Sequence, residues 1–344
     1  MLPLLFLLLL APLFLSSHPL YAAARPVPDG DHQTDTWRSF DRLLDAKRGS
    51  HVAGVADLKR YFARFGYLPE SGANLTDSYD ELFESAVTLY QTRFGLPVTG
   101  KLDSSTLAQI KSPRCGVSDS AVNRVNSEQK FAFFPGEPRW ARPGPLVLTY
   151  AVSPTATVDY IPRADVAAAF RRAFARWAQV IPVRFVEVAE YEAADVKVGF
   201  YGGDHGDGEP FDGVLGVLAH AFSPESGRLH LDAAERWAVD FGREKSDAAV
   251  DLESVATHEI GHVLGLGHSP VRDAVMYPSL KPRQRKAELR VDDVEGVQAL
   301  YGSNPGFQFS SILESDTSSS GRRRAGINII FVLAMAAMGI VVCM

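Results

Sequence analysis

The spacing of apolar residues predicts a small helical domain in residues 37–110. Three segments there carry apolar side chains every three or four positions, which is the period of an α-helix. They are Trp37–Leu44, Val55–Phe65 and Asp80–Phe94, and glycine and proline residues mark the turns between them. We therefore expect an all-α unit in this part of the chain.

The pattern changes near Phe131 and predicts a domain with both strands and helices. Short runs rich in β-branched and aromatic residues predict strands at Leu146–Val152, Val183–Val188, Val196–Tyr201 and Val214–Ala221. Helical spacing predicts three helices, one opened by Pro162, one over Val250–Leu264 and one from Asp292 to Gly302. Strands and helices in this order favour an α/β domain with a mixed sheet.

The composition is that of a globular protein and disfavours nucleic acid as a partner. The 344 residues are 46% hydrophobic and 22% charged, and the formal net charge is −6. A chain of this length can bury one or two cores. A negative net charge does not suit the binding of phosphates. We expect a monomer.

Both ends of the chain carry apolar segments that predict export and attachment to a membrane. Residues 1–24 have the apolar run and the small residues of a signal peptide. Residues 304–326 form a Ser-rich spacer, and residues 327–344 form an apolar tail that is marginal for crossing a bilayer. We favour a GPI-anchor signal, with a retained transmembrane helix as the alternative, and either one places the protein on the extracellular face of the plasma membrane. The candidate ω residues are Ser318, Ser319 and Ser320.

The sequence THEIGHVLGLGHS has residues spaced for binding a metal ion. On a helix, His258 and His262 project from one face, one turn apart. A turn at Gly265 would bring His268 round as a third imidazole and leave one tetrahedral position open, as in catalytic zinc sites. Glu259 has the reach of a general base. The alternative is an amphipathic helix with solvated histidines, but aliphatic residues already supply its apolar face.

This stretch resembles the metzincin pattern HExxHxxGxxH, which a methionine turn follows. Met276, within the sequence VMYP, fits that turn. The chain is most similar to the matrixins, and among them to the short plant-type members without a hemopexin-like domain. The resemblance implies a zinc endopeptidase with a zincin-like α/β (α+β) catalytic domain in residues 131–303, built of a mixed five-stranded sheet and three helices. It assigns the catalytic zinc to His258, His262 and His268, and the catalytic role to Glu259.

A second part of the resemblance precedes the catalytic domain. Residues 37–110 resemble the peptidoglycan-binding-like module that serves matrixins as a propeptide, and residues 113–119, PRCGVSD, resemble their cysteine switch. A thiolate from Cys115 would fill the open zinc position and keep the enzyme latent, and Arg114 could pair with Asp119 to fix the loop. Wall binding by the module and an inert buried cysteine are the alternatives. The expected propeptide is 25–130, and the segment suited to its removal is 120–130.

The segment from Tyr201 to Trp237 is rich in metal-ligand residues. Four of them could form a closed tetrahedral site typical of structural zinc, and matrixins place one on the matching residues, which are His205, Asp207, His220 and His230. The resemblance also implies at least one calcium ion, held by carboxylates and backbone carbonyls. The matching residues are Asp212, Gly213, Leu215, Asp232 and Glu235. A solvated acidic loop is the alternative.

The sequence thus predicts a secreted, surface-anchored zinc endopeptidase that is made as a latent zymogen and cuts extended peptide or protein substrates. The resemblance places the main specificity pocket between the metal helix and the segment after the methionine turn. There Ser254 is small and Leu280 stands where matrixins commonly have tyrosine, so we expect an open pocket for a large apolar residue just after the scissile bond. The alternatives are a surface protein that binds cell-wall polymers and a zinc hydrolase of cell-wall peptides. Asn74 begins a glycosylation sequon, so an exported chain is expected to be a glycoprotein.

Overall fold

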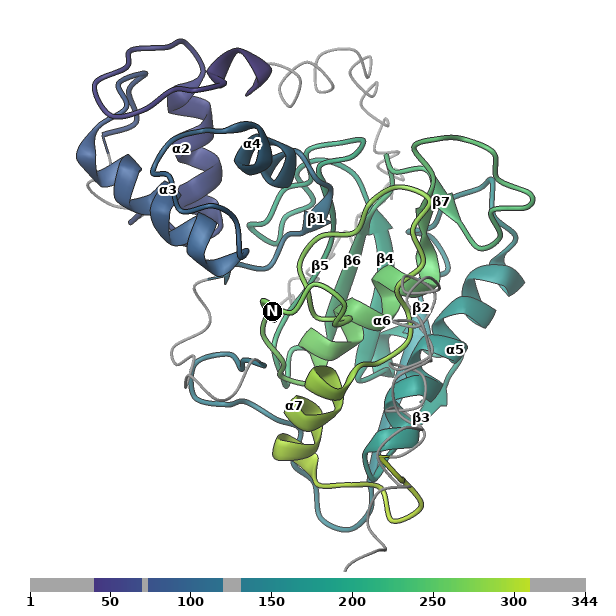
Figure 1. Ribbon diagram of the computed structural model, residues 1–344. Coiled ribbons are helices and arrows are strands. Elements are labelled where there is room, and N and C mark those ends of the chain that lie inside the picture. Colours follow the sequence, from purple (N-terminus) through teal and green to yellow (C-terminus); the bar gives the residue numbers. More distant parts are fainter. Residues whose placement is uncertain (1–39, 70–73, 120–130, 310–344) are drawn as a thin grey trace, which may run out of the picture.

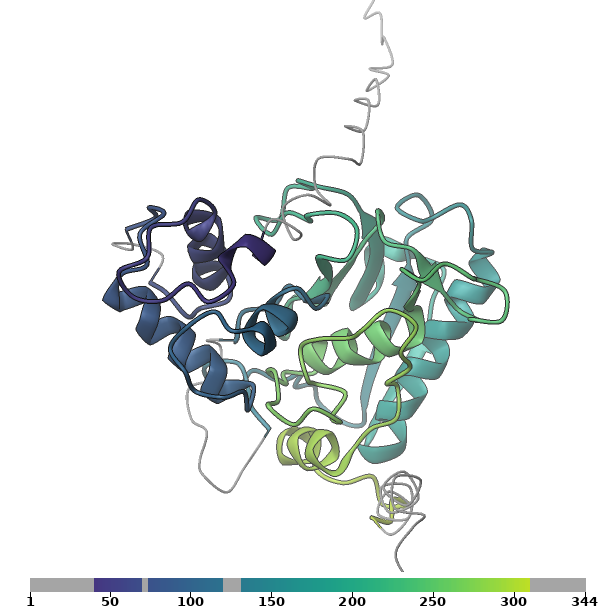
Figure 2. The same ribbon diagram turned by 45° about the horizontal axis from the view of Figure 1, so that its top comes forward.

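The computed structural model describes residues 40–69, 74–119 and 131–309. They form an all-α unit and an α/β unit, and Figures 1 and 2 show the first lying against one side of the second. This confirms the predicted fold class. The expected signal peptide, the 120–130 segment, the ω residues and the apolar tail lie outside the described residues.

The all-α unit consists of η1 (Phe40–Leu43), α2 (Val55–Arg64), α3 (Glu81–Arg93) and α4 (Ser104–Ile110). Its core is aromatic, with the ring of Phe62 5.1 Å from that of Phe83 and 5.2 Å from that of Tyr90. Asp80 and Asp103 cap the N-termini of α3 and α4 by accepting hydrogen bonds from backbone amides. The sequence pattern did not predict α4, because a helix of seven residues shows less than two full periods. The exposed Asn74 belongs to this unit.

The α/β unit contains a mixed sheet in the order β1-β5-β6-β4-β2-β3. The strands are β1 (Arg114–Cys115), β2 (Leu146–Val152), β3 (Val183–Glu187), β4 (Val196–Tyr201), β5 (Val217–Ala221) and β6 (Arg228–Asp232). Only β5 and β6 pair in antiparallel fashion. Five strands belong to the unit itself, as predicted, and the sixth, β1, comes from the segment that follows the all-α unit. A two-stranded sheet adds β7 (Trp237–Ala238) and β8 (Val250–Asp251).

The structure differs from the strand prediction at the start of β5 and at β6. The β5 strand begins at Val217 rather than Val214, because Leu215 has a φ of 63°, which a strand does not accommodate. The prediction also missed β6, where Leu229 and Leu231 alternate with polar residues over only five positions, a short pattern that is easily overlooked.

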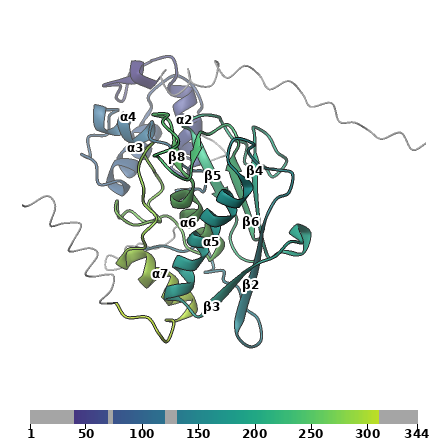
Figure 3. The same ribbon diagram turned by 90° about the vertical axis from the view of Figure 1, so that its right-hand side faces the viewer.

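Three helices complete the unit, namely α5 (Arg163–Val180), α6 (Leu252–Val263) and α7 (Val291–Tyr301), with a short η3 (Tyr191–Ala193) before β4. Figure 3 shows α5 and α6 side by side. The buried indole nitrogen of Trp177 in α5 donates a hydrogen bond of 2.9 Å to the carbonyl oxygen of Thr257 in α6. The helix that carries His258 and His262 is thereby fixed against the core.

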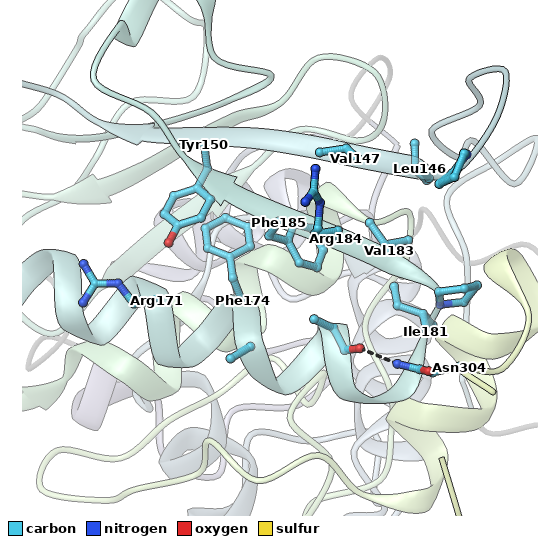
Figure 4. Close-up of a pocket in the computed structure, with 14 residues that line it drawn as sticks. Leu146, Val147, Tyr150, Arg171, Phe174, Ile181, Val183, Arg184, Phe185 and Asn304 are labelled. Atoms are coloured by element: carbon cyan, nitrogen blue, oxygen red, sulfur yellow. Dashed lines mark hydrogen bonds between the residues drawn. The ribbon is translucent and has the colours of Figure 1, made fainter. Parts of the chain in front are cut away.

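A groove of about 810 Å³ lies between α5 and the strands β2 and β3 (Figure 4). The rings of Tyr150 and Phe174 stack there with their centroids 4.0 Å apart. Asn304, which follows α7, donates a hydrogen bond of 2.9 Å to the carbonyl oxygen of Ala178, drawn as the dashed line in Figure 4. This bond fastens the segment after α7 to the last turn of α5. Within the described ranges, no helix combines the length and the hydrophobicity that a bilayer span requires.

Candidate active site

Local sequence places the three histidines on α6 and on the turn after it. Asp251 caps the helix by accepting a 3.0 Å hydrogen bond from the amide of Ser254. After the last turn Gly265 has a φ of +105°, and a Cβ there would lie 2.3 Å from the carbonyl oxygen of Pro138. Glycine therefore permits the reversal that returns His268 toward the helix.

The Nε2 atoms of the three histidines converge on one point. His262 Nε2 lies 3.1 Å from His258 Nε2 and 3.2 Å from His268 Nε2, and the remaining pair is 3.3 Å apart. Nitrogens about 2.0–2.1 Å from one tetrahedral zinc ion are roughly 3.4 Å apart, so the spacing fits zinc. Burial lowers the pKa of all three imidazoles, which favours the neutral form that binds metal.

The other ring nitrogen of each histidine has a hydrogen-bond acceptor. The Nδ1 atoms of His258 and His262 lie 2.7 Å from the carbonyl oxygen of Val275 and 2.8 Å from that of Leu266. With protons on Nδ1, both rings present bare Nε2 atoms to a metal.

The acceptor for His268 comes from the segment after the all-α unit. His268 Nδ1 lies 2.7 Å from a carboxylate oxygen of Asp119, and both side chains are buried. Sequence reasoning expected only the pairing of Asp119 with Arg114, and no signal in the sequence points to this additional contact.

Cys115 supplies a fourth ligand atom. Its sulfur lies 3.4 Å from His262 Nε2, and the four potential ligand atoms are all within 4.8 Å of one another. Burial raises the pKa of the thiol, and the nearby Glu259 carboxylate raises it further. A bound cation would reverse that preference and stabilise the thiolate.

Backbone pairing holds Cys115 in this position. The β1 strand runs parallel to β5, and the amides of Arg114 and Gly116 donate to the carbonyls of Gly216 and Ala219 at 3.0 and 2.8 Å. On the opposite side the amide of Cys115 donates to the carbonyl of Pro278 at 2.8 Å. The segment therefore lies in a cleft between β5 and the chain after Met276.

The predicted pairing of Arg114 with Asp119 is present and is almost fully buried. The guanidinium nitrogen is 2.8 Å from the carboxylate, and the guanidinium carbon lies 3.6 Å from the centre of the Phe65 ring. Tyr67 donates a further hydrogen bond of 2.8 Å to Asp119. The loop that carries Cys115 is thus anchored in the core of the all-α unit.

Glu259 faces the same cavity. The carboxylate is buried, and the thiol of Cys115 lies close enough to interact with it. Burial raises its pKa to about 8. A carboxyl group in this state can exchange a proton near neutral pH, as a general base and acid requires.

Met276 packs against α6 at Gly261. A Cβ added to Gly261 would stand 2.3 Å from the Met276 sulfur, so only glycine fits between them. Asp293 of α7 fixes the turn by accepting hydrogen bonds of 2.9 Å from the amides of Val275 and Met276. Sequence reasoning did not assign this role to Asp293.

A second cluster brings together the four residues expected to bind structural zinc. One oxygen of Asp207 lies 2.9 Å from His205 Nε2, 2.8 Å from His220 Nε2 and 2.7 Å from His230 Nδ1. His205 Nδ1 is 3.0 Å from the carbonyl of Gly203. Four protein ligands around one point would fill every position of a tetrahedral ion and leave none for a substrate.

The carboxylates expected to bind calcium lie between the loop before β5 and the end of β6. Asp232 accepts from the amide of Gly213 at 3.1 Å, and Glu235 accepts from the amide of Leu215 at 2.6 Å. Burial raises the pKa of Asp232 to about 6 and that of Glu235 to about 9, and the pKa of Asp212 is raised as well. A divalent cation bound between these buried carboxylates would stabilise their ionised form.

Comparison with known proteins agrees with this geometry. Residues 139–302 match the matrixin model of the peptidase M10 family, and residues 51–110 match a peptidoglycan binding domain. Metalloendoproteinase 1-MMP of Arabidopsis thaliana is 51% identical over 89% of this chain and 88% of its own length. Metalloendoproteinase 4-MMP of the same plant is 57% identical over 77% of this chain and 78% of its own length. Metalloendoproteinase 1 of Glycine max is 43% identical over 75% of this chain and 85% of its own length. The chain therefore belongs to the matrixin family of zinc metalloendopeptidases, which act on peptides and proteins.

Proposed function

We propose that this chain is the latent precursor of an extracellular zinc endopeptidase, inhibited by its own Cys115. The observation that carries the proposal is the position of the Cys115 sulfur, 3.4 Å from His262 Nε2, on a strand that fills the cleft beside β5. In this state a substrate can reach neither the metal position nor the edge of the sheet. Removal of residues up to the 120–130 segment opens both at once.

The edge of β5 binds the substrate once β1 has left. The carbonyls of Gly216 and Ala219, which accept from β1 in the precursor, become available to amides of an extended peptide. The carbonyl of Pro278 is released on the other side of the cleft. Backbone bonds of this kind hold any extended peptide, so the choice of sequence falls to the side-chain pockets.

Residues of this chain supply the proton transfers of peptide hydrolysis. His258, His262 and His268 would hold the catalytic zinc, which when bound activates water and polarises the scissile carbonyl. Glu259 takes a proton from the attacking water and delivers it to the leaving amine. The hydrogen bonds from Nδ1 of His258 and His262 to backbone carbonyls keep these rings oriented through the cycle.

The remaining features support a secreted and anchored enzyme with additional bound ions. The apolar residues 1–24 support export, and the tail at 327–344 supports a GPI anchor, with the ω site at Ser318, Ser319 or Ser320. The cluster around Asp207 supports a structural zinc ion. The carboxylates of Asp212, Asp232 and Glu235 support at least one calcium ion. We expect the enzyme to act as a monomer.

Wall-polymer binding by the all-α unit is the second candidate, because its residues match a peptidoglycan binding domain. One face of that unit is covered in the precursor, where Phe94 contacts Tyr277 with ring centroids 5.7 Å apart. Retention of the purified precursor on cell-wall polymer would support this role, and it is independent of proteolysis.

Two substitutions test the proposed function in the full-length precursor. Cys115→Ser removes the sulfur ligand that helps to hold β1 in the cleft, so β1 should leave more often and this precursor should cleave a quenched peptide without being cut, whereas the wild-type precursor should remain inactive. Glu259→Gln, measured after removal of the propeptide, should keep its zinc content and lose turnover. A latent Cys115→Ser precursor would contradict the inhibitory role of the thiol, and full turnover by Glu259→Gln would contradict the mechanism.

A further inference from the structure

A lysine closes the pocket that lies next to the candidate active site. The pocket is bordered by Glu259 and Cys115 on the side of the metal position, and apolar side chains such as Val255 and Leu280 form its walls. Lys286, from the segment between Met276 and α7, completes the lining together with Ser254. With Cys115 in place the enclosed space is about 20 Å³, which is room for about one water molecule.

The backbone of Lys286 is fixed at the end of this pocket. Its amide donates a hydrogen bond of 2.7 Å to the hydroxyl of Ser254 on α6, and that hydroxyl donates in turn to Asp251 at 2.7 Å. Ser254 and Lys286 therefore line this pocket next to each other, joined through the backbone of the lysine.

The ammonium group of Lys286 has incomplete hydrogen bonding. In the described part of the chain, its hydrogen-bond acceptors are the carbonyl oxygens of Tyr277 and Ser279, both at 3.5 Å, and it lies 4.9 Å from the centre of the Tyr277 ring. Good N–H···O bonds are about 2.9–3.0 Å long, so both contacts are weak. Among the described residues, no carboxylate comes within ion-pair distance of this lysine. An ammonium group with three donors can thus accept a further partner.

The group keeps its charge at neutral pH. Burial lowers the pKa of Lys286 to about 8, while the more distant carboxylates of Asp293 and Asp273 oppose that decrease. A cation in this setting gains more from an added acceptor than a solvated lysine does, because water does not compete for it.

The lysine also has space into which it can move. A second hollow of about 180 Å³ lies behind it, and Lys286 lines both spaces. Arg176 and Glu253 line the rear hollow, where they pair with each other at 2.7 Å. Because a lysine side chain has a flexible four-carbon stem, it can withdraw toward this hollow when a substrate side chain enters.

We infer that Lys286 is a specificity-determining residue of the peptidase and selects substrates in which the side chain directly after the scissile bond ends in a hydrogen-bond acceptor, as in glutamine or glutamate. The inference rests on the proposed function, since it requires a substrate to replace the Cys115 segment in the cleft. The apolar walls would pack against the methylene groups of such a side chain, and its terminal oxygen would accept from the ammonium group. This refines the sequence-based expectation of a preference for a large apolar residue.

The test compares quenched peptides that differ only at that position, carrying glutamine, glutamate, methionine or leucine. The enzyme is the full chain with a recognition site for a sequence-specific protease introduced in residues 120–130, so that every variant is activated in the same way. Lys286→Met keeps the length and removes the charge, and Lys286→Arg keeps the charge. Lys281→Met is the matched control, because Lys281 is exposed on the same segment.

In the wild type, the ratio of kcat/KM for the glutamine peptide to that for the methionine peptide should exceed the ratio in Lys286→Met by about tenfold or more, as expected for a hydrogen bond to a charged group. Lys286→Arg and Lys281→Met should keep the wild-type preference. Each ratio is measured within one protein, so a lower yield of folded enzyme cancels. An unchanged ratio in Lys286→Met, with all peptides still cleaved, would overturn the role of Lys286 alone. Failure of the activated wild type to cleave any peptide would overturn the proposed function and this inference with it.

Discussion

The guanidinium group of Arg114 is a buried polar anchor of residues 113–119, the inhibitory segment of our proposal, and its removal should weaken the proposed latency. It is buried against the Phe65 ring and pairs with Asp119 at 2.8 Å, with both side chains at most 2% exposed. It also donates to the carbonyl oxygen of Cys115 at 3.1 Å. Methionine at this position would preserve most of the packing on Phe65 while removing the charge and the donors.

The expected effect follows from the burial of the pair. Removing one partner of a buried ion pair costs about 3–5 kcal/mol, because the other charge loses its compensation. Asp119 keeps its hydrogen bonds with Tyr67 and His268, so the lower end of that range applies. About 3 kcal/mol corresponds to a roughly hundredfold larger population in which the segment has left the cleft.

The opening can be measured as the rate at which a thiol reagent modifies Cys115 in the intact precursor. The only other cysteine is Cys343, so Cys343→Ser serves as the background. Arg114→Met should be modified roughly a hundred times faster than this background and should cleave peptide while uncut. Arg60→Met is the control, because the Arg60 side chain is 59% exposed and forms a surface ion pair with Asp57, three residues earlier. If Arg114→Met reacts no faster than Arg60→Met, the buried pair does not hold the segment.

Three other predictions concern stability and metal content. Gly261→Ala should destabilise the catalytic unit by about 1–3 kcal/mol, because the new Cβ would overlap the Met276 sulfur, whereas Gly202→Ala, in open space, should leave the thermal midpoint nearly unchanged. Asp207→Ala should lower the zinc content by one ion per chain in metal analysis, and full retention would argue against the second site. Partial burial opposes ionisation of Asp103, but hydrogen bonds from neighbouring hydroxyl and amide groups lower its pKa to about 2 from 3.8. The stabilising contribution of the Asp103 carboxylate is therefore present above about pH 4 and is lost as the pH falls toward 2. The difference in thermal midpoint between wild type and Asp103→Asn should narrow from pH 5 to pH 3. A constant difference would refute this role of Asp103.

Periodic segments were predictable from the sequence because their pattern is local. The strands β2 and β4 have the expected bounds, and α6 differs from the expected helix only at its ends. The β1 strand was not predictable, because its two residues form a strand only by pairing with β5, about a hundred residues away in the chain. A strand of that length has no pattern of its own.

The candidate site likewise contains residues that a local pattern predicts and residues that only the folded structure reveals. The spacing of His258 and His262 on a helix and the glycine before His268 follow from backbone geometry, and the structure brings these side chains together as expected. The contact of Asp119 with His268 depends on how two units dock, which no periodicity records. The position of Lys286 beside the pocket was equally unpredictable, because a lysine in a charged segment ordinarily lies in solvent.

The inhibitory segment and the substrate cleft impose a shared constraint on the sheet. An endopeptidase that binds extended chains needs an exposed strand edge, and an exposed edge invites pairing with other chains. In the structure β1 covers the edge of β5, so the hydrogen-bonding groups of that edge are satisfied within one molecule. The pairing brings β1 very close to β5, and only glycine fits at position 116, because a Cβ there would lie 2.8 Å from the side chain of Val217. A bulky residue at Gly116 should therefore loosen β1 and expose the edge of β5. Such a substitution should weaken the proposed latency and, because the exposed edge can pair with other chains, also lower the solubility of the protein.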